Sequence, residues 1–417
     1  MILISHATGN QNLRNAALAM VQGGLLAELW TAISWNDRAF INRMLPGGLR
    51  AELQRRSFPE ALRPFIRTRP WKELCRLASI RMNWSSLYRD ESARFSIDAV
   101  FRAMDRHMAR RVLPRLKPSV VYAYEDGAME TFRAAKEMGI ARVYELPIGY
   151  WRAARAIFRE EREREPEWAV TLEGLGDSEA KLERKDEELR GASTIIVPST
   201  FVRDTLKMAP DMPPVPVHLN PYGGPSAVAE KVTARTNGKL RVLFVGSLGQ
   251  RKGLGYVLRA VEMLGNAVEL TLIGRKTTER CEPLNEGVKK HRWVTSVPHA
   301  EVLREMSQHD VLVFPSLFEG FGLVILEAMS QGLPVITTPN SGGLDVVTDG
   351  VDGFGVPIRS AEAIAEKLER LAADRALLAE MKNAAIATAR RNSWESYRRR
   401  LVEILAPVAA GTAEGAK

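Results

Sequence analysis

Two glutamates, Glu319 and Glu327, interrupt the apolar stretch SLFEGFGLVILEAMSQGLPVI (residues 316–336), and glycines flank the first of them. A carboxylate accepts two hydrogen bonds at once, so it can bind the neighbouring hydroxyls of a sugar or a ribose. Glycines in a turn leave backbone N–H groups accessible, and the amino end of a helix attracts anions. The stretch therefore predicts a site for an anion joined to a diol. The alternatives are a helix-start acid at Glu319 and a surface position at Glu327.

The elements around these residues predict how they are held. The run DVLVFPS is typical of a buried strand that ends near Ser316, and a helix is predicted from about Gly322 to Gln331, with Gly332 as a left-handed stop. In an open parallel sheet, ligands bind at the carboxyl ends of the strands. We expect the glycine turn at that edge and Glu327 in the second turn of the helix.

The whole chain has the pattern of two α/β domains. From Lys239 onward, short strand-like runs (LRVLFVGS, VELTLIG, RWVTS, DVLVFPS, LPVITTP) alternate with amphipathic helical runs, and the first half shows the same elements (MILISHA, SVVYAYE, RVYELPI, TIIVPS) less regularly. The proline- and glycine-rich stretch 210–225 predicts a boundary, giving an acceptor-binding domain over 1–222 and a donor-binding domain over 223–391. A terminal helix over 392–410 is predicted to pack back on the first domain, and residues 151–190 are predicted as solvent-exposed charged helices.

The composition is that of a globular enzyme. The chain has 417 residues, 45% hydrophobic and 26% charged, without the ~18 consecutive apolar residues that a membrane span needs. The amino terminus is typical of a buried strand rather than an export signal, which predicts a cytoplasmic protein. Cys75 and Cys281 fit neither a disulfide framework nor a metal site.

A net charge of +9 indicates anionic partners. Much of the excess lies between Arg50 and Lys117, in basic stretches that contain aromatic residues. Such helices suit an anionic membrane surface, which predicts possible peripheral contact at the inner membrane face; a simply solvated surface is the alternative. No zinc-finger, RNP or helix-turn-helix pattern accompanies the charge, which argues against nucleic acid.

The pattern P-S-x-x-E-G-F-G-x-x-x-x-E-A-M-x-x-G-x-P-V-I resembles the signature of retaining glycosyltransferases of family 4, and VGSLGQRKG, LTLIGR, SVPHAEVL and TTPNSGGLDVVTDGVDGFGVP follow the order of that family. The resemblance implies the GT-B fold, in which two Rossmann-like, doubly wound parallel-sheet domains face each other across a cleft and a C-terminal helix crosses back. It also implies retaining transfer of a hexosyl unit from a nucleotide sugar, UDP- or GDP-linked, to an acceptor hydroxyl. The acceptor would be a glycan, a polysaccharide precursor or a lipid-linked sugar, and no metal or other cofactor would take part.

The resemblance also assigns roles to donor-site residues. Glu319 would contact the donor sugar and Glu327 the ribose, while Lys252 in Q-R-K-G would hold the diphosphate. The family's usual arginine is replaced by Ser247, so Arg251 or Arg275 would supply the second cation. The backbone lining the sugar and diphosphate would come from Gly320, Phe321, Gly322 and Leu323.

Three further segments match the family less closely. A second phosphate-facing turn would hold Gly342 and Gly343, and the glycine loop of the first domain would contain Gly9 and Asn10. The segment YAYED lacks the histidine that the family often carries there, which leaves Tyr124, Glu125 and Asp126 as candidates for orienting the acceptor.

Other functions are less consistent with the motifs. Neither first strand is followed by G-x-G-x-x-G, which argues against a dinucleotide oxidoreductase, and the chain has no G-x-x-x-x-G-K-[ST] P-loop. A phosphorylase or a sugar-nucleotide epimerase of the same fold stays open. Because Ser247 replaces the family arginine, a catalytically impaired nucleotide-sugar-binding protein or a scaffold in polysaccharide assembly is the main alternative.

Overall fold

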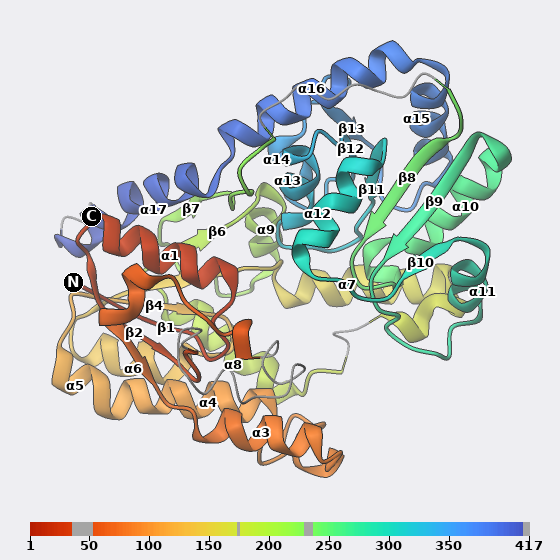
Figure 1. Cartoon of the computed structure of the whole chain (residues 1–417). Coiled ribbons are helices and arrows are strands. Elements are labelled where there is room, and N and C mark those ends of the chain that lie inside the picture. Colours follow the sequence, from red (N-terminus) through yellow and green to blue (C-terminus); the bar gives the residue numbers. More distant parts are fainter. Residues whose placement is uncertain (36–52, 173–175, 229–236, 412–417) are drawn as a thin grey trace, which may run out of the picture.

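The computed structural model describes residues 1–35, 53–172, 176–228 and 237–411. These residues form two α/β domains, each built around one parallel sheet (Figure 1). The predicted pair of doubly wound domains is confirmed. The first few residues of the basic stretch, Arg50 to Glu52, lie outside the described part of the chain.

The first sheet has the strand order β3-β2-β1-β4-β5-β6-β7. Its numbering runs in opposite directions on the two sides of the β1–β4 pair, and such a reversal is where open α/β sheets bind ligands. β1 and β4 are buried along their whole length, as strands covered on both faces should be. The strands are β1 (Ile2–Ser5), β2 (Leu26–Thr31), β3 (Ile66–Thr68), β4 (Val120–Tyr124), β5 (Ala141–Glu145), β6 (Thr194–Val197) and β7 (Val217–Leu219).

The second sheet has the order β10-β9-β8-β11-β12-β13, and its reversal lies between β8 and β11. Val311 and Leu312 of β11 pair in parallel with Val242 and Leu243 of β8, so the two strands end at the same edge. The strands are β8 (Leu240–Val245), β9 (Val268–Ile273), β10 (Arg292–Val294), β11 (Val311–Phe314), β12 (Val335–Thr337) and β13 (Gly353–Gly355).

Helices cover both sheets (Figure 1). In the first half they are α1 (Gln11–Gln22), η2 (Glu60–Phe65), α3 (Trp71–Arg81), η3 (Ser85–Leu87), α4 (Ile97–His107), the π-turn η4 (Met108–Val112), α5 (Leu113–Leu116), α6 (Met129–Glu137), α7 (Trp151–Arg164), η5 (Pro166–Thr171), α8 (Glu179–Gly191), α9 (Thr200–Thr205) and η6 (Leu206–Met208). In the second half they are η7 (Gln250–Lys252), α10 (Leu254–Leu264), η8 (Gly265–Ala267), α11 (Glu282–Lys290), α12 (His299–Gln308), α13 (Leu323–Ser330), α14 (Gly343–Val346), α15 (Ala361–Ala373), α16 (Arg375–Arg391) and α17 (Trp394–Ala409).

The chain crosses between the domains at two places that lie side by side. The Gly224 amide donates to the Asn392 carbonyl at 2.8 Å, and the Trp394 amide donates to the Gly224 carbonyl at 3.3 Å. α17 then returns to the first domain, where Arg398 donates to Asn15 of α1 at 2.9 Å (Figure 1). Both crossings therefore form one hinge region.

Residues 151–171, α7 and η5, leave the first sheet and pack on the second domain; we call them the arm (Figure 1). Trp168 is buried among residues of β8 and α10. Glu161 is fully buried, and so is Glu188 of α8 within the first domain. The prediction of solvent-exposed helices over 151–190 is therefore wrong for their inner faces, because a charged side chain can be buried when partners from distant parts of the chain satisfy it.

Four strands gave no clear signal in the sequence. β3, β7 and β13 have three residues each, and β13 contains two glycines. β2 carries Glu28, which pairs with Arg115 at 2.6 Å. β7 lies inside the stretch predicted as a linker, so the chain leaves the first sheet only after Leu219.

Candidate functional site

Two segments follow the strands at the reversal of the second sheet. The turn that carries Arg251 and Lys252 follows β8, and the loop that carries Glu319 follows β11. The two segments touch: the Leu317 amide donates to the Arg251 carbonyl at 2.9 Å. Gly253 has φ +72°, and a Cβ there would lie 2.2 Å from the Pro315 carbonyl oxygen. Only glycine allows this approach, which fixes the turn against the loop.

Two cations converge on one carboxylate at this point. The Arg251 guanidinium donates to Glu319 Oε2 at 3.0 Å and to the Phe318 carbonyl at 3.1 Å. The Lys252 ammonium contacts the same Oε2 and lies 4.8 Å from the centroid of the Phe314 ring. The side chains are 23%, 11% and 17% exposed for Arg251, Lys252 and Glu319. Two positive charges and one negative charge leave a net positive site.

For both Lys252 and Glu319, burial and the neighbouring opposite charge shift the pKa in opposite directions. Burial lowers the pKa of Lys252, and the attraction of Glu319 only partly offsets it. Burial disfavours the Glu319 carboxylate, but Lys252 and Arg251 outweigh that cost and lower its pKa. A nearby diphosphate would favour the charged form of Lys252, so the site is suited to an anion.

Arg251 is the cation that joins Lys252 at the Glu319 carboxylate. Arg275 is exposed at the carboxyl end of β9, and Ser247 is half-buried after β8. Neither contributes to the contacts around Glu319 that are described here, whereas Arg251 makes two of them. Of the two alternatives for replacing the family arginine, the geometry favours Arg251.

Glu327 lies in the second turn of α13, as the sequence predicts. Its Oε1 is 2.9 Å from Nε2 of His299, the first residue of α12, and a hydrogen bond with Glu327 raises the pKa of that histidine. His299 was not among the predicted site residues. It could have been noticed in SVPHAEVL, because it directly follows the proline that precedes α12.

The glycine loop between Glu319 and α13 also meets the first domain. A Cβ on Gly320 would lie 1.8 Å from the Pro147 carbonyl oxygen, and Ser199 donates its hydroxyl to the Gly320 carbonyl. Gly322 has φ +87° and starts α13, while Phe321 is buried. Leu323 is half-buried in the first turn of the helix. The domains are therefore in direct contact at the predicted donor loop.

The second glycine turn supports this loop. The Gly342 amide donates to the Phe321 carbonyl at 2.9 Å, and the Gly343 amide donates to the Ser341 hydroxyl at 3.0 Å. These amides are thus bonded within the domain, and their contact with a phosphate stays a prediction. Tertiary hydrogen bonds of this kind leave no mark on the local sequence.

The loop after β1 holds Gly9 and Asn10. The Gly9 amide donates to His6 Nδ1 at 3.3 Å, and Gly9 has φ +67°. The Asn10 side chain accepts from the Leu13 amide at 2.8 Å and caps α1, so its observed role is structural. The Gly9 amide is bonded within the loop, and contact of Gly9 with a ligand stays a prediction.

A histidine does stand at the carboxyl edge of the first sheet, although not after β4. His6 follows β1, and its ring meets that of Tyr124 edge to face at 5.1 Å between centroids. Burial lowers the pKa of His6 to about 4. The neutral ring accepts from the Thr8 and Gly9 amides. Because the expected histidine belongs after β4, the role of His6 was not predicted.

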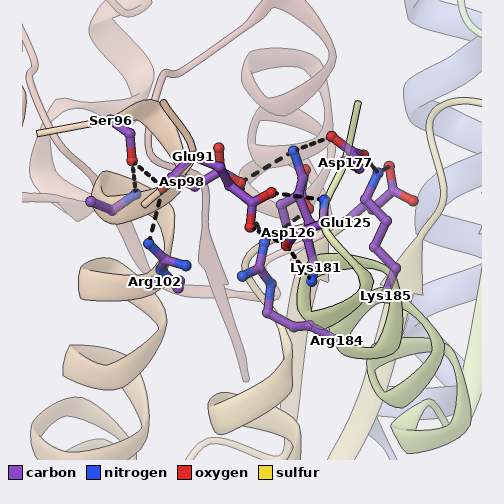
Figure 2. Close-up of polar contacts among 12 residues, drawn as sticks. Glu91, Ser96, Asp98, Arg102, Glu125, Asp126, Asp177, Lys181, Arg184 and Lys185 are labelled. Carbon is purple, nitrogen blue, oxygen red and sulfur yellow. Dashed lines mark hydrogen bonds and ion pairs between the residues drawn. The ribbon is translucent and has the colours of Figure 1, made fainter. Parts of the chain in front are cut away.

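Glu125 and Asp126 are held by cations of α8 (Figure 2). Lys185 lies 3.4 Å from Glu125, and Arg184 lies 3.4 Å from Asp126. Burial raises the pKa of Glu125 to about 7 against the opposing effect of Lys185. These acceptor candidates thus belong to an ion-pair network that also includes Asp98, Asp177 and Lys181.

The arm holds the turn that presents the cations, and this was not predicted. The Gln250 amide donates to the Thr171 hydroxyl at 2.9 Å. The Gln250 side chain donates to Glu161 at 2.7 Å and accepts from the Gly255 amide at 3.1 Å. Gln250 is fully buried and directly precedes Arg251.

Glu161 is the centre of this clamp. Besides Gln250, it accepts from the Tyr256 hydroxyl at 2.8 Å and from Arg359 at 2.7 Å. A buried carboxylate with three donors is well satisfied. The clamp therefore ties the first domain, through the arm, to the turn that carries Lys252.

A cavity of about 880 Å³ lies at the opposite end of the second sheet, around the amino ends of β8 and β9. No predicted donor-site residue lines it. We place the candidate site at the carboxyl ends despite this cavity, because the charged cluster and the contact between domains are both there.

Comparison with solved structures defines the class of fold. Sucrose-phosphate synthase from Thermosynechococcus elongatus superposes with a TM-score of 0.67 over 98% of this chain and 99% of that chain, at 17% identity. The Anabaena protein HepE, solved in complex with UDP, gives 0.62 over 97% and 99%, at 15% identity. The chain thus has the GT-B fold.

Sequence comparison finds relatives of the second half of the chain. Residues 228–388 match the family described as "Glycosyl transferases group 1". A sucrose synthase of Acidithiobacillus caldus is 41% identical over 27% of this chain and 16% of its own length. The capsular polysaccharide biosynthesis glycosyltransferase CapM of Staphylococcus aureus is 31% identical over 36% of this chain and 40% of its own length. The similarity therefore spans less than half of either relative.

Proposed function

We propose that the protein is a retaining glycosyltransferase that moves a hexosyl unit from a nucleotide sugar to an acceptor hydroxyl. The observation that carries this proposal is the convergence of Arg251 and Lys252 on Glu319 inside the group 1 motif, where the two domains meet. The relatives named as glycosyltransferases and synthases support the same class of reaction.

The residues divide the work on the donor. Arg251 and Lys252 would bind the diphosphate and stabilise the charge that grows on it as the glycosidic bond breaks. Glu319 would exchange its cation partners for hydroxyls of the sugar, and Glu327 would bind the ribose after release from His299. Side-chain cations would replace the divalent metal that other glycosyltransferases use.

Retention needs no enzyme nucleophile in this scheme. The departing phosphate oxygen takes the proton of the acceptor hydroxyl as that hydroxyl attacks the same face of the sugar. The protein contributes alignment and charge stabilisation once the domains close. His6 and Tyr124 lie at the edge of the first sheet, where the acceptor would approach. We propose a glycan, a polysaccharide precursor or a lipid-linked sugar as the acceptor, because CapM acts in capsule biosynthesis.

A thermal-shift panel of UDP-, GDP-, ADP- and dTDP-sugars tests the donor. A ligand at about 100 times its Kd stabilises the folded state by about 2.7 kcal/mol, so only the cognate nucleotide raises the Tm clearly. Slow hydrolysis of that donor, with the sugar product followed by NMR, then reports the anomeric configuration. Absence of any shift across the panel would contradict the proposal.

A catalytically impaired nucleotide-sugar binder or scaffold in polysaccharide assembly is the second candidate. The observation that favours it is Ser247, which replaces a cation of the family pattern. A Tm shift with a nucleotide sugar but no hydrolysis and no transfer would support this candidate over the enzyme.

A further inference from the structure

The outer side of α3 exposes apolar side chains. Trp71, Leu74 and Met82 are 74%, 44% and 56% exposed; Trp71 and Leu74 lie three residues apart on one side of α3, and Met82 directly follows its last residue. Trp84, just beyond the helix, is 51% exposed. The opposite side carries the buried Glu73 and packs on the domain. We call Trp71, Leu74, Met82 and Trp84 the α3 surface.

Cations surround the α3 surface. Residues 67–117 contain thirteen lysines and arginines and five acids; of these cations, Arg67 and Arg115 pair with Glu28, and Arg76 pairs with Glu73. Several cations bond to backbone oxygens rather than to carboxylates. Lys72 donates to the Arg94 carbonyl at 3.4 Å, and Arg102 donates to the Glu91 carbonyl at 3.3 Å. Their positive charge is thus left for an external partner.

The cations lie close enough to one another to interact. Burial lowers the pKa of Lys72, and the neighbouring Arg106, Arg102, Arg94 and Arg69 lower it further. α3 packs beside α4 at the outer end of the first domain, away from the second sheet (Figure 1). A partner bound there leaves the region between the domains accessible.

We propose that the α3 surface docks on an anionic lipid bilayer, with Trp71, Met82 and Trp84 inserted below the headgroups and the surrounding cations at the phosphates. Aromatic and aliphatic side chains ringed by cations match the two zones of such an interface. A nucleic acid would satisfy the cations and stack on the tryptophans, but would give Leu74 and Met82 no apolar environment. No described helix is long and apolar enough to span a bilayer, so this would be attachment at the surface.

The structure also changes the expected salt dependence. Cations alone would predict binding that salt abolishes, because screening at high ionic strength removes exposed charge interactions. The α3 surface adds an apolar contribution that salt does not screen. Part of the binding to anionic vesicles should therefore persist at high salt.

Sedimentation of the full chain with vesicles tests the proposal. The vesicles are phosphatidylcholine alone or mixed with phosphatidylglycerol, at low and high salt. We compare Met82→Ser with Met263→Ser, a matched control in the second domain that is 57% exposed against 56%. Because insertion removes the apolar Met82 side chain from water, Met82→Ser should weaken partitioning about tenfold, and Met263→Ser should leave it unchanged.

Charge is tested in the same way. Arg106→Glu should weaken binding at low salt much more than Arg280→Glu, an exposed position of the second domain, and the difference should shrink at high salt. The proposal is overturned if mixed vesicles do not sediment the protein, if the two serine variants behave alike, or if polynucleotide competes with the vesicles for the α3 surface. Nucleotide-sugar Tm shifts should be the same in Met82→Ser and wild type, so failure here is distinguishable from failure of the proposed function.

Discussion

Replacing Gln250 by alanine should lower both the stability of the protein and the activity that depends on the turn carrying Arg251 and Lys252. A control variant distinguishes the two effects. The change removes one hydrogen bond to the charged Glu161 and one to the Gly255 amide, while Glu161 keeps Tyr256 and Arg359 as partners. A bond to a charged group contributes about 1.5 to 3 kcal/mol and a neutral one about 0.5 to 1.5 kcal/mol. The expected loss is therefore about 2 to 4.5 kcal/mol, which a domain stable by about 5 to 15 kcal/mol tolerates.

The catalytic effect should be larger than this loss implies. Arg251 and Lys252 follow Gln250 directly, and a displacement of about 1 Å at a reacting centre can cost about 100-fold in rate. We expect kcat for donor hydrolysis or transfer to fall by about 10- to 100-fold, with little change in KM because the remaining donor contacts persist. The assay follows release of the nucleoside diphosphate at a temperature where both proteins are folded.

Asp105→Ala is the matched control. Asp105 is also buried, and its carboxylate accepts from the amides of Glu130 and Thr131 at 2.8 Å, so its loss removes a comparable pair of bonds. It lies in the first domain, outside the contacts of the cation turn. Its Tm should fall while kcat stays near wild type. Equal kcat losses in the two variants, or an unchanged kcat in Gln250→Ala, would refute the idea that the arm positions Lys252.

Three further perturbations have defined outcomes. Lys252→Ala should lower kcat by about 100- to 1,000-fold in steady-state kinetics, the range observed for loss of one charge-stabilising donor, and Lys252→Arg should recover part of it; an unchanged kcat would exclude Lys252 from the diphosphate site. Burial raises the pKa of Glu125 to about 7, above its unfolded value near 4.5, so the folded state binds the extra proton between these values. Wild-type stability in urea titrations should then fall as the pH rises from about 4.5 to 7 relative to Glu125→Gln, and a parallel pH profile of the two proteins would contradict this. Chelation by EDTA should leave turnover unchanged, since side-chain cations are proposed to hold the diphosphate; activity lost to EDTA and restored by a divalent ion would refute that proposal.

The sequence alone predicted the donor loop well because the loop is local. A buried strand, a proline, a glycine turn and a helix with a left-handed stop at Gly332 follow one another, and each has a direct backbone cause. The cation pair was also visible, although the choice between Arg251 and Arg275 needed the fold. Nothing in the local sequence shows which of these arginines reaches Glu319, and only the contact of Arg251 with that carboxylate distinguishes them.

The packing of the arm could not be predicted, because it depends on contacts with distant parts of the chain. FREEREREPEW has the charge density of an exposed helix, and no local feature marks Glu161 as buried. Its partners Gln250 and Arg359 lie far along the chain, so its burial depends on tertiary structure. The same holds for Gly342, whose amide is occupied by the Phe321 carbonyl. Which charges are buried and which amides are bonded depends on contacts made in the folded structure, not on the local sequence pattern.

The arm supports both sides of the charged cluster. On the cation side, Thr171 and Glu161 hold Gln250 next to Arg251. On the carboxylate side, the Phe158 ring packs edge to face on Phe318 at 5.7 Å, one residue before Glu319. The arm continues directly from the first sheet, which would bind the acceptor, so a movement of that domain that displaces the arm must displace the cations and the carboxylate together. The geometry of the proposed donor site and the position of the first domain would thereby be coupled through α7.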